Sequence, residues 1–157
     1  MIRQSLVLLT LLLAVSACAS TATSPRARAV AIPELRGPEL AMALSVARST
    51  GRNVLVEYTD EGCSADRRMQ ERTLTDPEVK DRLKSVVYVR LIKGESAAGF
   101  EERFGERGTP TFIVMRPDGT TPGSLVTGEI GTEDFRNYLA WARTARGPEP
   151  EFTPGAT

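Results

Sequence analysis

The order of the predicted helices and strands between residues 38 and 145 is the feature that most constrains the fold of this chain. Apolar residues at helical spacing alternate along the chain with short runs of β-branched and aromatic residues. Helices are expected over 38–48, 63–72, 76–84, 96–104 and 132–145, and strands over 53–58, 85–92, 111–115 and 124–127. Helices interleaved with strands, followed by a closing hairpin and helix, predict an α/β domain. Its central mixed four-stranded sheet would carry helices on both faces.

Local residues indicate where several of these helices begin and end. Pro38 and Pro77 suit the first turn of a helix, where the missing N–H costs nothing. Asp76 is placed to cap the helix that Pro77 opens. Gly105 is placed to end the helix over 96–104.

The composition excludes several classes of functional site. The chain has no histidine and only two cysteines, which excludes Ser-His and Cys-His catalysis, His-ligated metals and cysteine-rich metal centres. Twenty lysines and arginines balance 20 aspartates and glutamates, so the charge gives no reason to expect nucleic-acid binding. No phosphate-binding glycine loop is present, and no metal or other cofactor is predicted.

The first residues are typical of an export signal rather than of a folded domain. Arg3 precedes the apolar run from Leu6 to Val15, which is short for a membrane-spanning helix and has the length of a signal-peptide core. The run ends in Val15-Ser16-Ala17-Cys18, which resembles the lipobox of bacterial lipoproteins and implies a lipidated mature N-terminus at Cys18. The alternative is an ordinary secretory signal with an incidental cysteine.

This interpretation divides the chain into four parts. Residues 1–17 would be the lipoprotein signal peptide, and residues 18–36 the lipidated N-terminus with a flexible tether. The domain would occupy residues 37–146, and the proline-containing tail over 147–157 is predicted to be disordered. The mature protein would be exported and lipid-anchored, on the periplasmic face of the outer membrane in a Gram-negative cell. Cys63 would then be its one free thiol.

Four stretches of the chain match motifs of one known fold. They are Val54-Leu55-Val56-Glu57-Tyr58, Thr73-Leu74-Thr75-Asp76-Pro77-Glu78-Val79, Gly108-Thr109-Pro110-Thr111-Phe112, and Val126-Thr127-Gly128 followed by Glu133-Asp134-Phe135. Through these motifs the chain resembles the thioredoxin-like superfamily over roughly residues 38 to 145. The resemblance is to the compact thioredoxin-like domains of bacterial envelope proteins, such as the C-terminal domain of transmembrane thiol:disulfide interchange proteins.

In that family a nucleophilic cysteine stands at a helix N-terminus, and Cys63 matches its position. Unpaired N–H groups and the helix dipole there stabilise the thiolate, which is the attacking species. The alternative for a single cysteine is a small buried apolar side chain. Most relatives carry tryptophan before this cysteine. This chain carries Gly62, which is expected to leave either the thiol more open or the loop more mobile.

Asp66 stands where the family's Cys-x-x-Cys motif has its second cysteine. That cysteine attacks the mixed disulfide and releases the product, which a carboxylate cannot do. A carboxylate about one helical turn from Cys63 also disfavours the thiolate, and Arg67 and Arg68 are the neighbours that could offset this charge; the sequence leaves open which effect wins. Alternatively, Asp66 only stabilises the start of the helix.

Two further positions match functional residues of the family. Glu57 falls where relatives carry a buried carboxylate that accepts a proton from the second cysteine, so here it would move a proton for Cys63 through water. The alternative is a solvated strand residue. Pro110 matches the family's cis-proline, which follows the backbone of Thr109 that pairs with an extended substrate. The alternative is an ordinary trans proline at the start of a strand.

These residues favour thiol–disulfide exchange through Cys63, by an atypical monothiol oxidoreductase whose resolving thiol comes from outside the domain. The partners would be thiols and disulfides of envelope proteins, and the membrane through the N-terminal lipid. The alternative is a redox-inactive binding module that presents a peptide-binding groove near the membrane. Oxidation of Cys63 to a sulfenic acid and a disulfide-linked homodimer are further possibilities for this thiol.

Overall fold

The computed structural model describes residues 38–152 of the chain, so the predicted signal peptide, Cys18 and the tether lie outside these residues. The helices are α1 (Pro38–Thr50), α2 (Ser64–Arg68), α3 (Pro77–Leu83), α4 (Ala98–Phe104) and α5 (Thr132–Thr144), with a π-helical turn, η1 (Met69–Thr73), after α2. The strands are β1 (Val54–Thr59), β2 (Val87–Ile92), β3 (Thr111–Met115) and β4 (Val126–Thr127). No helix within residues 38–152 is long and apolar enough to cross a membrane.

The four strands form one mixed sheet in the order β2-β1-β3-β4. Strand β1 runs parallel to β2 and antiparallel to β3, and β4 pairs with β3 in the antiparallel sense. All six residues of β1 are buried, as expected for a central strand. Its Glu57 lies beside Arg90 of β2 and Phe112 of β3. This sheet confirms the predicted α/β class and its mixed, four-stranded centre.

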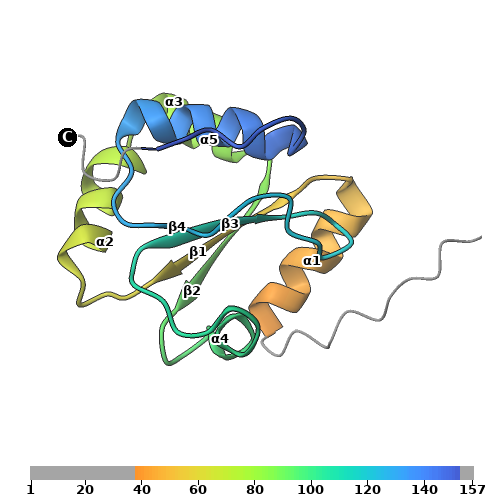
Figure 1. Ribbon diagram of the computed structural model, residues 1–157, viewed down its shortest axis with the longest axis horizontal. Helices are drawn as coiled ribbons and strands as arrows, with labels where there is room; N and C mark the ends of the chain where they lie inside the picture. Colours follow the sequence, from red (N-terminus) through yellow and green to blue (C-terminus); the bar gives the residue numbers. More distant parts are fainter. Residues whose placement is uncertain (1–37, 153–157) are drawn as a thin grey trace, which may run out of the picture. The chain divides into compact units, whose positions relative to one another are not determined.

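Helices cover both faces of the sheet, with α3 and α5 on one side and α1 and α4 on the other (Figure 1). Because strand residues alternate between faces, Leu55 and Phe112 join the core under α3 and α5. Val56 and Ile113 join the other core, with Phe100 of α4. Burying one such side chain contributes about 1.5–3 kcal/mol, so both faces must remain covered for the sheet to be stable.

Asp76 caps α3, as its position before Pro77 predicts. Its Oδ1 accepts hydrogen bonds from the N–H groups of Glu78 and Val79, both at 3.0 Å. Arg136 of α5 binds the other carboxylate oxygen at 2.7 Å. The hydrogen bond from Arg136 is the largest cause that holds the pKa of Asp76 below its usual value, followed by the N–H of Val79. The same carboxylate therefore starts α3 and ties it to α5.

The helix predicted over 63–72 changes its hydrogen-bond pattern at η1. The N–H of Leu74 donates to the carbonyl of Met69 at 2.8 Å, which is the wider i→i+5 spacing of a π-helix. Thr73 Oγ1 donates to the carbonyl of Ile130 at 3.0 Å, and the N–H of Ile130 lies 3.3 Å from Met69 Sδ. The helical pattern in the sequence did not show this change, which ties the end of α2 to the segment after β4.

Strand β4 is shorter than the predicted strand over 124–127. The N–H of Ser124 donates to the carboxylate of Glu149 at 2.8 Å instead of joining the ladder. Pairing with β3 is therefore confined to Val126 and Thr127.

Part of the tail that was predicted to be disordered packs on the domain. The ring of Phe152 meets Tyr138 of α5 edge-on, with centroids 5.2 Å apart. Trp141 Nε1 donates to the carbonyl of Gly147 at 3.4 Å. These contacts order residues 147–152, which we call the C-terminal strap, whereas residues 153–157 lie outside the described part. The sequence did not predict the strap because its contacts, through the Phe152 ring, the Glu149 carboxylate and the Gly147 carbonyl, are made with residues outside the segment rather than within it.

Candidate functional site

Cys63 lies at the N-cap position of α2, after the loop that follows β1. Its backbone is extended, with φ −82° and ψ 129°, and its N–H donates to the carbonyl of Asp60 at 3.0 Å. The side chain is half-buried, belongs to neither core cluster and forms no disulfide. The thiol therefore lies partly exposed beyond the end of β1. It is not a fully buried apolar side chain.

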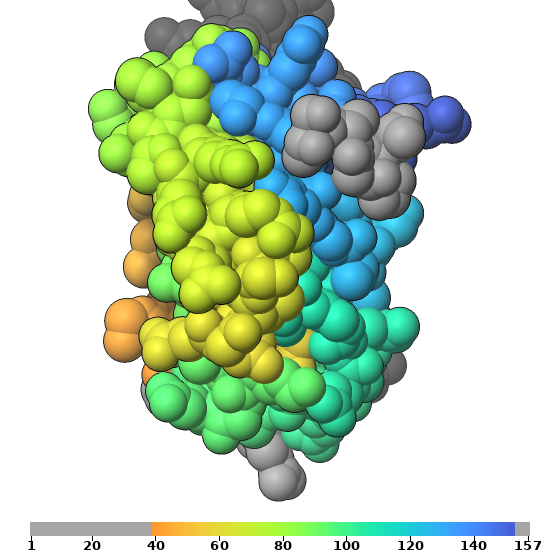
Figure 2. Space-filling view, turned by 90° about the vertical axis from the view of Figure 1, so that its left-hand side faces the viewer, coloured from red at the N-terminus to blue at the C-terminus, as the bar shows by residue number. Residues whose placement is uncertain are grey.

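The Cys63 thiol contacts the loop that precedes β3. Its Sγ lies 3.3 Å from the carbonyl oxygen of Thr109. The peptide bond between Thr109 and Pro110 is cis, and the carbonyl of Pro110 accepts from the N–H of Gly128 at 2.8 Å. Figure 2 shows this face, on which the yellow atoms before and along the start of α2 lie beside the teal atoms of the loop before β3. The fold thus brings Cys63, Thr109 and Pro110 together.

Gly62 leaves space beside the thiol. Its N–H donates to Asp60 Oδ1 at 2.9 Å, and a Cβ built on Gly62 would meet only that oxygen, at 3.3 Å. Its φ lies outside the left-handed region, so no backbone strain requires glycine here. Position 62 is exposed and could carry a side chain, so glycine leaves the approach to Cys63 open.

Asp66 points into the domain rather than toward solvent. The residue is 2% exposed, and its Oδ1 accepts a hydrogen bond from Thr59 Oγ1 at 2.5 Å. Its Oδ2 is buried without a hydrogen-bond partner among the described residues. A surface carboxylate that only stabilises a helix start would be solvated, so this buried position requires another account.

Glu57 is fully buried, so the alternative of a solvated strand residue is wrong. Its carboxylate accepts from Gln70 Nε2 at 3.1 Å and from the hydroxyl of Tyr88, and it lies 3.3 Å from Arg90 Nε. Burial raises the pKa of Glu57, and the charge of Asp66 raises it further. Tyr88, Arg90 and Gln70 act against this rise.

The side chain of Arg67 forms no ion pair or hydrogen bond with Asp66 or Cys63 among the described residues, and only its backbone N–H donates, to the carbonyl of Cys63 at 3.2 Å. Its side chain is exposed, and the neighbouring Arg68 pairs with Glu129 at 2.5 Å. The charge of Arg67 therefore acts across solvent, where such interactions are weak, and the charge of Arg68 is paired with Glu129.

Sequence reasoning missed Thr59, Gln70, Tyr88 and Arg90, which complete the polar surroundings of the two carboxylates. A period-two pattern could have found part of this set, because Tyr88 and Arg90 share one face of β2 beside Glu57. The orientation of Asp66 leaves no such signal in the chain.

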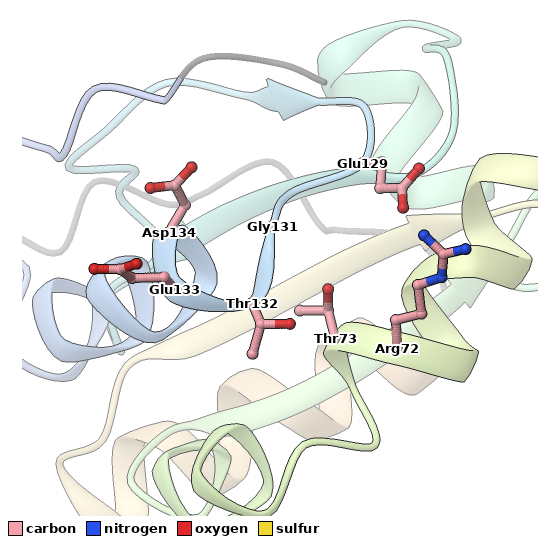
Figure 3. Close-up of a pocket in the computed structure, with 7 residues that line it drawn as sticks. All are labelled: Arg72, Thr73, Glu129, Gly131, Thr132, Glu133 and Asp134. Atoms are coloured by element: carbon pink, nitrogen blue, oxygen red, sulfur yellow. The ribbon is translucent and has the colours of Figure 1, made fainter. Parts of the chain in front are cut away.

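A separate pocket of about 450 Å³ lies between η1 and the start of α5. Arg72, Thr73, Glu129 and residues 131–134 line it. Figure 3 shows the guanidinium of Arg72 directed toward the carboxylate of Glu129. The lining contains no thiol, and no group of three or more Cys, Asp or Glu residues within 38–152 is placed to hold a metal ion. Within residues 38–152, Cys63 is therefore the candidate reactive group.

A comparison with protein families identifies the domain. A family model described as a thioredoxin-like domain matches residues 40–143. The chain belongs to this family. The match spans α1 to α5, so the thioredoxin-like fold includes both the Cys63 helix and the Pro110 loop.

Curated relatives of this thioredoxin-like protein are thiol:disulfide interchange proteins. It is 32% identical over 112 residues to DsbD of Pseudomonas fluorescens, and this alignment covers 69% of this chain and 19% of that protein. It is 30% identical over 110 residues to DsbD 1 of Pseudomonas aeruginosa, with 68% and 19% covered. The aligned part thus spans about a fifth of the length of these relatives.

Solved structures show the same fold. A thioredoxin from Thermus thermophilus has a TM-score of 0.59 and 25% identity, and the match covers 66% of this chain and 83% of that one. The reduced C-terminal domain of DsbD from Neisseria meningitidis has a TM-score of 0.54 and 21% identity, with 68% and 94% covered. The match covers nearly all of the DsbD C-terminal domain, so residues 38–152 have the fold of one complete domain of this type.

Proposed function

We propose that this thioredoxin-like protein carries out thiol–disulfide exchange through the single thiol of Cys63. The observation that supports this most is the position of Cys63, which is half-buried at the start of α2 with its Sγ 3.3 Å from the carbonyl of Thr109. A thiolate with access for a disulfide is all that each half of the exchange requires. Similarity to thiol:disulfide interchange proteins supports the same chemistry.

The first half of the exchange captures a substrate. The Cys63 thiolate attacks one sulfur of a substrate disulfide, the substrate S–S bond breaks, and a mixed disulfide forms with Cys63. The other substrate sulfur leaves as a thiolate and takes a proton from solvent. Thr109 would place the substrate, because its backbone adjoins Pro110 on an open face beside the thiol.

The second half of the exchange needs a thiol from outside the domain. Asp66 occupies the position of the second cysteine, and Cys63 is the one cysteine among residues 38–152. An external thiolate attacks the substrate sulfur of the mixed disulfide, and Cys63 leaves as a thiolate. A partner reductase or a second substrate cysteine would supply this thiol.

The setting we propose for this reaction is the bacterial cell envelope. The N-terminal sequence, with its lipobox-like end at Cys18, supports export and a lipid anchor. The natural partners would then be thiols and disulfides of other envelope proteins. Labelling with radioactive palmitate tests the anchor, and Cys18→Ser should abolish the label.

Exposure of the full chain to a peptide disulfide tests the proposed exchange. The chain would carry Cys18→Ser and be purified in detergent, so that Cys63 is its only cysteine. Intact mass should show one peptide per chain, lost on treatment with dithiothreitol and absent from a Cys63→Ser variant. An unmodified mass after prolonged exposure at pH 8 would contradict the proposal.

A redox-inactive peptide-binding module is a second candidate, and the carboxylate at position 66 is the observation that favours it. Asp66 removes the internal resolving thiol while the loop with Thr109 and Pro110 is kept. Such a module would bind a peptide that lacks cysteine with the same affinity as the matching peptide that carries a disulfide. Its affinity would be unchanged by Cys63→Ser, which distinguishes it from covalent capture.

A further inference from the structure

The polar side chains behind Cys63 form one connected cluster. Asp66 accepts from Thr59 Oγ1 at 2.5 Å, and Thr59 Oγ1 lies 3.4 Å from a terminal guanidinium nitrogen of Arg90. Arg90 Nε in turn lies 3.3 Å from Glu57 Oε2. Asp66 and Glu57 are thus linked through one threonine and one arginine, although they lie on different elements.

The donors in this cluster are distributed unequally between the two carboxylates. Glu57 has three, from Gln70, Tyr88 and Arg90, whereas Asp66 has only Thr59 and leaves Oδ2 without a partner among the described residues. Among the described residues, Arg90 is the one cation that contacts the cluster. It lies beside Glu57 and reaches Asp66 only through Thr59, so the two carboxylates share it. Two ionised carboxylates would therefore leave a buried negative charge with no cation, which costs several kcal/mol.

We propose that Glu57 and Asp66 act as one buried acid that holds a single proton behind Cys63, and that Asp66 thereby sets how the thiol responds to pH. The effect on the thiol rests on the proposed exchange at Cys63, whereas the shared proton does not. The acid acts as a positioning and charge-setting group, since neither carboxylate contacts Cys63 directly in the structure.

The other titratable groups that face the pair keep a fixed charge. The pKa of the Tyr88 hydroxyl is raised by burial and by the charge of Glu57, so Tyr88 keeps its proton throughout the physiological range. Arg90 stays protonated because its guanidinium does not titrate in proteins. The pair is therefore the part of the cluster whose charge changes.

The position of Asp66 on the helix connects the pair to the thiol. Cys63 is the N-cap of α2 and Asp66 is the third residue of that helix, so both lie within its first turn. Loss of the shared proton leaves both carboxylates ionised, and the added negative charge behind the start of α2 disfavours the thiolate. The thiol should therefore react faster, at a given pH, while the pair keeps its proton.

Carbon-13 NMR of the side-chain carboxyl groups tests the shared proton directly. The full chain carrying Cys18→Ser, in detergent, would be titrated while the resonances of Glu57 and Asp66 are followed. The pair should release its last proton well above the usual carboxyl pKa of about 4, and Asp66→Asn should lower the midpoint of Glu57. Two independent titrations near the usual value would overturn the inference.

The alkylation rate of Cys63 by iodoacetamide as a function of pH tests the effect on the thiol. The plot of rate against pH should show one inflection from ionisation of the thiol. A second inflection should appear at the pH where the Glu57–Asp66 pair loses its shared proton. Glu57→Gln and Asp66→Asn should each remove it, and Asp66→Asn should raise the rate near neutral pH several-fold. A second inflection that persists in both variants would overturn the coupling.

Glu101→Gln is the matched control for these variants. Glu101 is also a partly buried carboxylate that accepts from a tyrosine, Tyr58, at 2.8 Å, but Tyr58 belongs to the core on the opposite face of the sheet. Its replacement should leave both the titration of the pair and the second inflection in place. If Cys63 captures no disulfide but the carboxyl titration is as expected, the proposed function fails while the shared proton stands.

Discussion

The Sγ atom of Cys63 lies 3.3 Å from the carbonyl oxygen of Thr109, so the thiol at the start of α2 donates to the loop before β3. This contact joins two segments that lie 46 residues apart in the chain. The carbonyl would otherwise be available to an extended partner. Ionisation of the thiol removes its proton and the hydrogen bond together, so a reactive Cys63 and an available Thr109 carbonyl arise in the same step.

Gly62→Trp should slow the reaction of Cys63 with bulky thiol reagents. The structure leaves position 62 exposed, so an indole ring there would cover the approach to the thiol. We expect a several-fold lower rate with a large maleimide and a smaller change with iodoacetamide. The unfolding free energy should change by less than about 0.5 kcal/mol, as for most surface substitutions.

Gly62→Ala is the control for that variant. Its Cβ would meet only Asp60 Oδ1, at 3.3 Å, so both rates should stay near those of the wild type. Equal maleimide rates for Gly62→Trp and wild type would show that position 62 does not control access.

Glu57→Gln should flatten the dependence of stability on pH above pH 4.5. Because burial raises the pKa of Glu57, the folded state holds its proton more tightly than the unfolded state does. The stability that this proton supplies is fully present below the ordinary value of 4.5 and is lost as pH rises through the raised pKa. Within that window the wild type should lose up to about 1.4 kcal/mol per pH unit.

Urea denaturation at a series of pH values measures this dependence. Glu57→Gln cannot ionise, so its unfolding free energy should fall less than that of the wild type between pH 4.5 and the raised pKa. Parallel curves for the two proteins would mean that Glu57 titrates alike in the folded and unfolded states.

Gly123→Ala should destabilise the domain and release the C-terminal strap. A Cβ at position 123 would lie 2.6 Å from Trp141 Cη2 and 2.6 Å from Glu149 Oε1. The Glu149 side chain can move away, but the indole of Trp141 is packed in the core. We expect a loss of about 1–3 kcal/mol in unfolding free energy, as for other overpacked sites.

Protease digestion distinguishes release of the strap from a general loss of stability. Cleavage after residue 146 should become faster in Gly123→Ala than in wild type under conditions where the domain itself stays folded. Phe152→Ala should have the same effect, because it removes the edge-on contact with Tyr138. Unchanged stability and unchanged cleavage would show that the strap tolerates the added methyl group.

The order of elements and the start of α3 could be predicted from the sequence because their causes are local. The apolar spacing of α1 and α5 and the β-rich composition of β1 and β2 act within short windows. Asp76 and Pro77 are neighbours, so the cap could be placed without knowledge of the fold. The thioredoxin-like resemblance added the proximity of Cys63 and Pro110, which lie far apart in the chain.

The interior of the candidate site could not be predicted in the same way. Whether Asp66 faces solvent or the domain depends on Thr59, at the end of another element, offering its hydroxyl. The burial of Glu57 depends on Tyr88 and Arg90 of the neighbouring strand. The strap was missed for a similar reason, since Phe152 is ordered only by its contact with a distant helix. Such contacts follow from tertiary packing and leave no local pattern.

The release of a captured peptide by the full chain and by its Asp66→Cys variant tests whether Cys63 carries out exchange as a single thiol. Both proteins would carry Cys18→Ser and react with the same peptide disulfide, and intact mass would follow the adduct over time. The wild type should keep the peptide as a mixed disulfide until an external thiol is added. Asp66→Cys should release the peptide and form an internal disulfide. A wild-type chain that never forms the adduct, or that releases the peptide as fast as the variant, would contradict one-thiol exchange at Cys63.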